Sequence, residues 1–147
     1  MNGRLFEDIT EFHKKFGLEP PSPETHVLPS DLLAFRVKFI IEELKEYCSA
    51  MGVDWWATST EDAHGVSVNS RYFPDMENVL DALVDLTYVV LGLAYVHGFK
   101  FNEAWDRVHA ANMTKVRAQR TEDSARGGTW DVVKPPDFKR PDLGDLL

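Results

Sequence analysis

Apolar side chains recur at helical spacing in four stretches of this chain, and the stretches are bounded by residues that typically start or stop a helix. Polar capping residues precede three of them, and a glycine follows three of them. We therefore expect four helices: residues 5–16 before Gly17, residues 30–51 from the N-cap Ser30 to Gly52, residues 75–97 from the N-cap Asp75 to Gly98, and residues 103–115 capped by Asn102.

The segments between these helices show no clean helical or strand period. Residues 18–29 contain four prolines, which preclude regular structure and predict a strap or connector. Residues 53–73 mix two tryptophans with glycine, serine and threonine, so we expect an irregular excursion with room for one short helix. The polar tail, residues 127–147, should be held by packing onto the bundle or not at all; its expected anchors are Trp130, Phe138, Leu143 and Leu146.

The third expected helix is apolar nearly all round, which is typical of a helix inside a bundle. Two aspartates, Asp81 and Asp85, nevertheless interrupt it. At about 100° per residue they share a stripe about 60° wide with Asn78, so both carboxylates point the same way. We expect this stripe to lie in the core, where a carboxylate must be neutralised, hydrogen-bonded or bound to a metal ion.

The second helix carries three more carboxylates, Glu42, Glu43 and Glu46, within an arc of about 100°. Such a triplet alone is more often a solvated helix face than a metal site. Together with the two aspartates it makes five acids that would repel one another unless cations lie between them. Oxygen ligands without a suitable cluster of cysteine and histidine favour Mg²⁺ or Mn²⁺ over Zn²⁺. The pattern predicts a hard-metal site.

Other site classes fit the sequence less well. A di-iron carboxylate site needs Glu-x-x-His on two helices. The chain has Glu61 and His64 in an expected loop, and Asp106 and His109 in the fourth helix, and neither pair matches the central acids as required. The histidines are individually expected at the surface, in caps or in the core. The sequence has no Gly-rich phosphate loop, nucleophile elbow or dinucleotide fingerprint.

Composition narrows the class of protein further. With 147 residues and 44% hydrophobic side chains, the chain forms one domain, residues 1–147. A net charge of -8 argues against a nucleic-acid or membrane-surface binder, which needs clustered positive charge. The single cysteine, Cys48, cannot form an internal disulfide and fits a reducing compartment. The N-terminus lacks a signal-peptide core, and the longest apolar run, residues 86–96, is too short to span a bilayer, so we expect a soluble, cytoplasmic protein.

The two acidic motifs carry a family resemblance. Glu42-Glu43-x-x-Glu46, followed by Asp81-Ala-x-x-Asp85, resembles the all-α nucleoside triphosphate pyrophosphohydrolase superfamily, which includes MazG-type enzymes, dimeric dUTPases and phosphoribosyl-ATP pyrophosphohydrolases. The superfamily's second motif is commonly Glu-x-x-Asp. Here Ala82 occupies the glutamate's place, and Asp81, one residue earlier, would have to serve, which the shared helix face tolerates. Further stretches look like a MazG-like branch of phages and bacteria: residues 12–17, 88–92, 109–115 and 134–143.

The resemblance implies an all-α, MazG-like helical bundle that oligomerises and hydrolyses a nucleotide between its α- and β-phosphates. The products are a nucleoside monophosphate and pyrophosphate. Two or more Mg²⁺ or Mn²⁺ ions would lie at the acids, where Glu42 would hold a further ion or orient the attacking water. The ligands that the resemblance implies are Glu43, Glu46, Asp81 and Asp85.

A triphosphate substrate also needs cations and a base pocket. The candidates for phosphate binding are Asn112, Lys115, Arg117 and Lys134, although a helix C-terminus favours cations without any ligand. Two adjacent tryptophans suit a purine, and some similar phage MazG-like enzymes act on guanine nucleotides, so dGTP or GTP is expected over dUTP or dCTP. The candidates for base binding are Phe39, Trp55, Trp56, Asn78 and Phe138.

Two further expectations concern partners. A helix bundle of this size would bury more surface by pairing, most simply in a homodimer or in a homotetramer built from two dimers. The residues expected at such an interface are Phe99, Phe101, Trp105 and the apolar tail residues. The rival to an enzyme is a catalytically silent helical interaction module, whose acids bind a structural cation.

Overall fold

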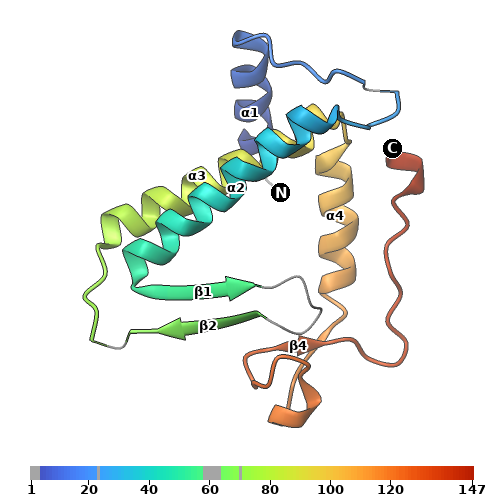
Figure 1. Cartoon of the computed structure of the whole chain (residues 1–147). Helices are drawn as coiled ribbons and strands as arrows, with labels where there is room; N and C mark the ends of the chain where they lie inside the picture. The colour runs from blue at the N-terminus through green and yellow to red at the C-terminus, as the bar shows by residue number, and fades with distance from the viewer. Residues whose placement is uncertain (1–3, 23, 58–63, 70) are drawn as a thin grey trace.

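The computed structural model describes residues 4–22, 24–57, 64–69 and 71–147, and within them it confirms the four expected helices (Figure 1). These are α1 (Arg4–Lys15), α2 (Ser30–Met51), α3 (Met76–Val96) and α4 (Phe101–Asn112). The protein is therefore mostly helical, in agreement with the all-α class expected from the sequence.

Local sequence explains several helix ends. Asp75 caps α3, because its carboxylate accepts a hydrogen bond from the backbone N–H of Asn78 at 3.2 Å. Gly52 follows α2 with a φ of +65°, and Gly98 follows α3 with a φ of +76°. A residue without a Cβ adopts this left-handed conformation at low cost, so both glycines end their helices as expected.

Two of the expected caps are wrong. Ser30 already belongs to α2, and Pro29 occupies the N-cap position. Helix α4 begins at Phe101, so Asn102 lies inside its first turn. Neither of these two helix starts has a side-chain hydrogen bond from its N-cap residue.

The centre of the fold is the antiparallel pair of α2 and α3, and α1 packs across the C-terminal end of α3 (Figure 1). The main apolar cluster lies at this end and contains Ile9, Leu28, Leu91, Tyr95 and Val96. Two polar side chains are buried nearby, His13 with 1% and Arg36 with 8% of its surface exposed. The core is thus concentrated at one end of the helix pair.

The expectation that α3 is buried on all sides is wrong for the single chain, because two neighbouring helices cover only part of it. The exposed apolar residues of α3 are Met76, Leu80, Leu83, Val84 and Val90. Helix α2 shows the same effect: Leu33, Val37 and Ile41 are exposed, while Ile40, Leu44 and Tyr47 are half-buried and Cys48 is buried.

The length of α3 bears on the expectation that the longest apolar run, residues 86–96, is too short to span a bilayer. Among the described residues, Met76–Val96 is long and apolar enough to cross a bilayer by length and composition, although its longest uninterrupted apolar run is short. The core helix of a soluble protein passes the same test, so this property supports a membrane span only weakly. In this structure α3 packs against both α1 and α2.

The excursion after α2 is a β-hairpin in its described part, so the expected irregular segment with a short helix is wrong there. Strands β1 (Val53–Ala57) and β2 (His64–Val68) pair antiparallel, with Val53 opposite Val68 and Trp55 opposite Val66. Directly opposed residues share a face, so these four apolar side chains form one side of the ribbon. Each strand has only five residues, too few for a reliable period in the sequence.

The tail returns along α4 and is fastened at its end (Figure 1). Arg107 of α4 donates hydrogen bonds to the Asp145 carboxylate and to the Asp142 carbonyl, each at 2.8 Å. Two short strands, β3 (Val116–Arg117) and β4 (Val132–Val133), pair antiparallel before it, and short 3-10 turns cover Thr121–Asp123 and Gly144–Leu146. Of the expected anchors, Leu146 is buried and Phe138 and Leu143 are half-buried. The expectation that Trp130 anchors the tail is wrong, because 91% of this residue is exposed.

Candidate functional site

The five acids meet across the α2–α3 interface. Glu43 of α2 is the central one, because the charges of Glu42, Glu46, Asp81 and Asp85 all act on it. Burial is the largest cause of its raised pKa, and repulsion by these four carboxylates adds to the shift. The antiparallel packing therefore brings together the two acidic stripes that helical periodicity predicts separately.

Glu43 differs from the other four acids in its burial. Its side chain is half-buried, and its Oε2 atom is fully covered without a hydrogen-bond partner in the described structure. Glu42, Glu46, Asp81 and Asp85 are exposed, so the expectation of two core aspartates is wrong. They lie toward the open side of the helix pair, where none of the described helices covers the acidic stripe.

The residues fit a hard cation in chemistry, while their present spacing is too open to ligate one. All the ligand atoms would be carboxylate oxygens, which Mg²⁺ and Mn²⁺ prefer, and the unpartnered Oε2 of Glu43 is an acceptor that a cation would satisfy. Among the described residues, no three Asp, Glu, His or Cys side chains are grouped closely enough to hold an ion. The exposed acids would have to change rotamer to close around it.

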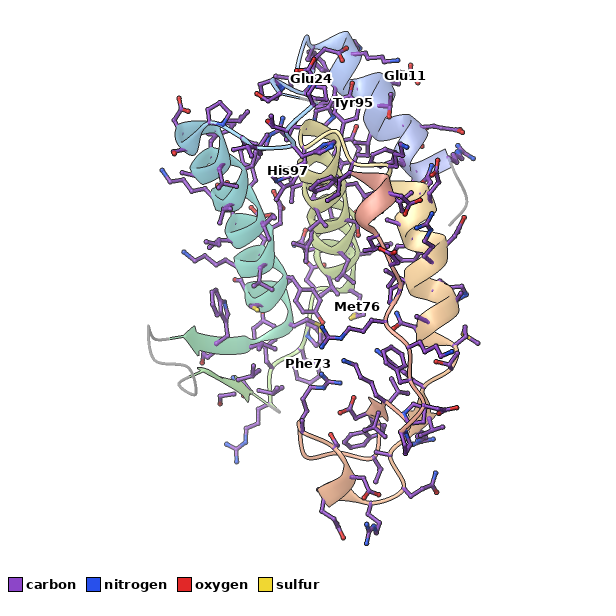
Figure 2. All side chains as sticks on the ribbon, turned by 90° about the vertical axis from the view of Figure 1, so that its right-hand side faces the viewer. Glu11, Glu24, Phe73, Met76, Tyr95 and His97 are labelled. Atoms are coloured by element: carbon purple, nitrogen blue, oxygen red, sulfur yellow. The ribbon has the colours of Figure 1, made fainter. Side chains whose placement is uncertain are left out.

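A polar cavity of about 450 Å³ adjoins the acids. It lies between the last turns of α2 and the first turns of α3, near Phe73 and Met76 and remote from Tyr95 and His97 (Figure 2). Its walls include Glu46, Ser49, Tyr72, Asp75, Asn78 and Asp81. Tyr72 and Ser49 were missed by the sequence analysis, and no periodic signal in the sequence places Tyr72 beside this helix pair.

The expected phosphate-binding residues are only partly brought together. The ammonium groups of Lys115 and Lys134 lie 6.0 Å and 5.3 Å from the ring centre of Phe138, which they flank as cation–π partners. Arg117 donates from Nε to the Thr129 carbonyl at 2.8 Å, and Asn112 is exposed at the end of α4. None of these cations is among the charges that shift the pKa of Glu43.

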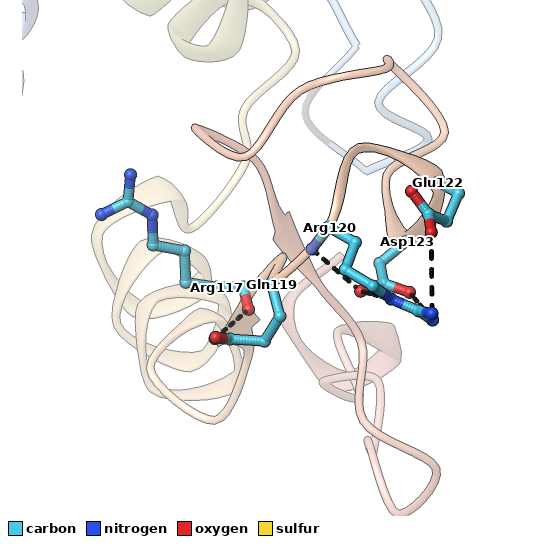
Figure 3. A network of polar contacts seen from close by, with 5 residues as sticks. All are labelled: Arg117, Gln119, Arg120, Glu122 and Asp123. Atoms are coloured by element: carbon cyan, nitrogen blue, oxygen red, sulfur yellow. Dashed lines mark hydrogen bonds and ion pairs between the residues drawn. The ribbon is translucent and has the colours of Figure 1, made fainter.

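Arg120, a further cation of this region, is held by local acids (Figure 3). Its Nη2 atom lies 2.9 Å from Asp123 Oδ1, and its Nη1 atom lies 3.6 Å from Glu122 Oε1. Gln119 donates to the backbone carbonyl of Arg117 at 3.2 Å in the same network. Arg120 is therefore paired with acids two and three residues further along the chain.

The expected base-binding residues are dispersed. Asn78 lines the cavity beside the acids. Phe39 is half-buried with its ring centre 4.6 Å from that of Phe35, and Trp55 is half-buried on the hairpin. Phe138 lies with the two lysines. The side chain of Trp56 falls outside the described residues.

Comparison with known proteins gives a family for this arrangement. The family model of phosphoribosyl-ATP pyrophosphohydrolase matches residues 9–112, a range that contains all five acids and the cavity. That family lies within the MazG-like all-α nucleoside triphosphate pyrophosphohydrolase superfamily. Its members are soluble enzymes that act on a nucleotide and generally use a divalent metal ion such as Mg²⁺. A comparison with curated proteins gives no match.

Proposed function

This chain belongs to the phosphoribosyl-ATP pyrophosphohydrolase family, and on that premise we propose that it hydrolyses a nucleoside or deoxynucleoside triphosphate between the α- and β-phosphates. The products would be a nucleoside monophosphate and pyrophosphate. The observation that carries the proposal is the environment of Glu43. This carboxylate is partly buried, its Oε2 atom has no hydrogen-bond partner in the described structure, and the charges of four other acids add to the rise in its pKa that burial causes.

In this proposal Glu43, Glu46, Asp81 and Asp85 hold Mg²⁺ or Mn²⁺, which when bound supplies positive charge to offset the phosphate oxygens. Glu42 is exposed and can accept a proton from the attacking water as a general base, or bind a further ion. Because burial, and then repulsion by the neighbouring acids, raises the pKa of Glu43, cation binding and deprotonation of Glu43 support one another.

Support for the remaining groups is indirect. Lys115 and Lys134, paired on the ring of Phe138, form the strongest cationic group among the proposed phosphate-binding residues. Guanine nucleotides remain the proposed substrates because the acids adjoin a cavity that is large enough for a purine. The lone buried thiol of Cys48 fits the reducing cytoplasm, where we place the enzyme.

The test is incubation of the purified protein with Mg²⁺ or Mn²⁺ and each of the eight common ribo- and deoxyribonucleoside triphosphates, together with phosphoribosyl-ATP. We expect pyrophosphate and a monophosphate, with dGTP or GTP favoured over the pyrimidine nucleotides by more than about tenfold in kcat/KM, an amount that one or two hydrogen bonds to the base can supply. Release of orthophosphate and a diphosphate would refute the proposed bond cleavage. Turnover in the presence of excess chelator would refute the metal site.

The rival interaction module makes a different prediction for the same protein. If the acids only bind a structural cation, chelation should lower the melting temperature while no nucleotide is hydrolysed under any condition. Metal-dependent turnover excludes this reading.

A further inference from the structure

The cavity beside the acids reaches from the acidic cluster to the segment that precedes α3. Glu46 and Asp81 line the part that adjoins Glu43, and Tyr72 lines the part beyond the last turn of α2. A ligand whose phosphates lie at the acids would therefore extend along the cavity toward Tyr72.

Tyr72 is positioned before any ligand arrives. Its backbone N–H donates to the Asn69 carbonyl at 3.0 Å, and the Asn69 N–H donates to the Gly52 carbonyl at 3.0 Å. Its ring lies directly on Gly52, where an added Cβ would come within 2.4 Å of Cγ of the ring. A side chain at residue 52 would displace this ring, so glycine there keeps an aromatic wall in a fixed place.

The hydrogen-bonding character of the cavity follows from Asp75 and Asn78. The Asp75 carboxylate accepts from the backbone N–H of Asn78 at 3.2 Å and from its side-chain Nδ2 at 2.8 Å. Because a carboxylate only accepts, the Asn78 amide must turn its nitrogen toward Asp75, which directs its Oδ1 atom, an acceptor, away from Asp75. The Asp75 carboxylate is a further acceptor, and none of the described residues that line the cavity is a cation.

Resting on the proposed function, we propose that this cavity holds the nucleobase, with Tyr72 as the stacking wall, and that its acceptors select guanine. Guanine presents two adjacent donors, the N1–H and the 2-amino group, to Asn78 Oδ1 and the Asp75 carboxylate. The hydroxyl of Ser49 can donate to its O6 atom. Tyr72 and Asn78 thus become specificity-determining residues of the site.

Other bases match these acceptors less well. Uracil and thymine place a carbonyl on each side of a single N–H donor, so their oxygens would face carboxylates. Adenine and cytosine offer one amino group beside an unprotonated ring nitrogen, which is itself an acceptor. Hypoxanthine is the sharpest comparison, because it differs from guanine only by lacking the 2-amino group.

The experiment compares kcat/KM for GTP and ITP in the wild type and in two pairs of variants. In the wild type GTP should be favoured by at least about tenfold, since an acceptor left without its donor discriminates strongly. Asn78→Ala should bring the ratio toward one, whereas Glu77→Ala, on the neighbouring exposed position of α3, should keep it. Tyr72→Leu should raise KM about fivefold or more for every nucleotide at unchanged kcat, whereas Phe73→Leu, 94% exposed, should not.

Binding of GMP and IMP to the same proteins, measured by calorimetry, separates this proposal from the proposed reaction. Selective GMP binding that Asn78→Ala and Tyr72→Leu weaken, without turnover of any nucleotide, would support the cavity and refute the reaction. Turnover with an unchanged GTP/ITP ratio in Asn78→Ala and an unchanged KM in Tyr72→Leu would overturn the cavity and leave the reaction standing. Tyr72 lies outside α3, so its variant tests the cavity even if the loss of Asn78 weakens the helix start.

Discussion

At the scale of single residues, Glu43 shows a conflict between stability and function. Its raised pKa means that the ionised form is disfavoured in the folded protein relative to the unfolded chain. The metal-free protein should therefore be most stable when this carboxyl is protonated, and should lose that stability as the pH rises from the ordinary glutamate range through the raised pKa. Ionised Glu43 therefore destabilises the folded, metal-free protein, and a bound cation would offset this destabilisation.

Replacing this carboxylate should move activity and stability in opposite directions. We expect Glu43→Gln and Asp85→Asn each to lower kcat at least about hundredfold, because a metal ligand is lost. Each should also raise the melting temperature of the metal-free protein by a few degrees, because one of several clustered charges is removed. Turnover assays and thermal melts with a chelator measure the two effects.

Glu77→Gln is the matched control, since this exposed residue of α3 lies outside the acidic cluster and should change neither quantity. If Glu43→Gln instead unfolds the protein, the acids are structural and the conflict inferred for them does not exist.

At the scale of elements, a buried polar contact joins α1 to α2. The Nδ1 atom of His13 lies 2.8 Å from the Ile9 carbonyl, and its Nε2 atom lies 3.2 Å from Nη1 of Arg36 on α2. The carbonyl only accepts and the guanidinium only donates, so His13 must be neutral, with its proton on Nδ1. Gly92 of α3 makes room, because a Cβ there would lie 3.0 Å from His13 Cε1.

This contact predicts a loosening of α1 in acid. Burial lowers the pKa of His13, Arg36 lowers it further, and the Ile9 hydrogen bond and the Glu19 charge oppose these effects only in part. The third polar group packed on the imidazole is Tyr95, whose hydroxyl donates to Glu19 at 3.1 Å. The unfolded chain therefore binds a proton more readily than the folded one, and stability should fall as the pH drops below about 6.5.

Denaturant unfolding between pH 8 and pH 5 measures this effect as the difference between the wild type and His13→Gln, which cannot gain a proton. The wild type should lose more stability than the variant over this range. The corresponding change at an exposed position, His109→Gln, should leave the wild-type slope intact. Equal slopes for the wild type and His13→Gln would show that the buried imidazole does not control the attachment of α1.

At the scale of the whole molecule, one chain leaves much apolar surface open. Two adjoining grooves run along α3, one against α1 and one toward α4, and both include Leu5, Thr87 and Leu91. Val84, 54% exposed, and Trp105, 44% exposed, lie in these grooves. A contiguous apolar surface of this kind is typical of a protein interface. We propose that a second copy covers it in a homodimer, from which a homotetramer can be built.

Assembly can be tested by light scattering at micromolar concentration, where we expect a dimer or tetramer. Val84→Glu places a charge in the groove and should shift the protein toward monomer. Val27→Glu, at a position 67% exposed outside both grooves, should keep the assembly. A monomeric wild type would contradict the proposal.

The sequence by itself determined the four helices, most of their glycine ends and the two acidic stripes. Each of these depends on the 3.6-residue period or on a capping residue a few positions away, so the information is local. The meeting of Glu43 with Asp81 and Asp85 also followed, because two stripes of like charge on neighbouring apolar helices are tolerated when a cation can join them.

Only the tertiary structure decided which helix faces are covered and which residues outside the helices lie beside them. The exposure of Asp85 and Val84 depends on how many helices surround α3, and the sequence of one chain does not state that number. The place of Tyr72 against Gly52 depends on the path of a hairpin between them. Such contacts arise from the packing of whole elements, and packing is set by the sum of many weak interactions that no local pattern in the sequence records.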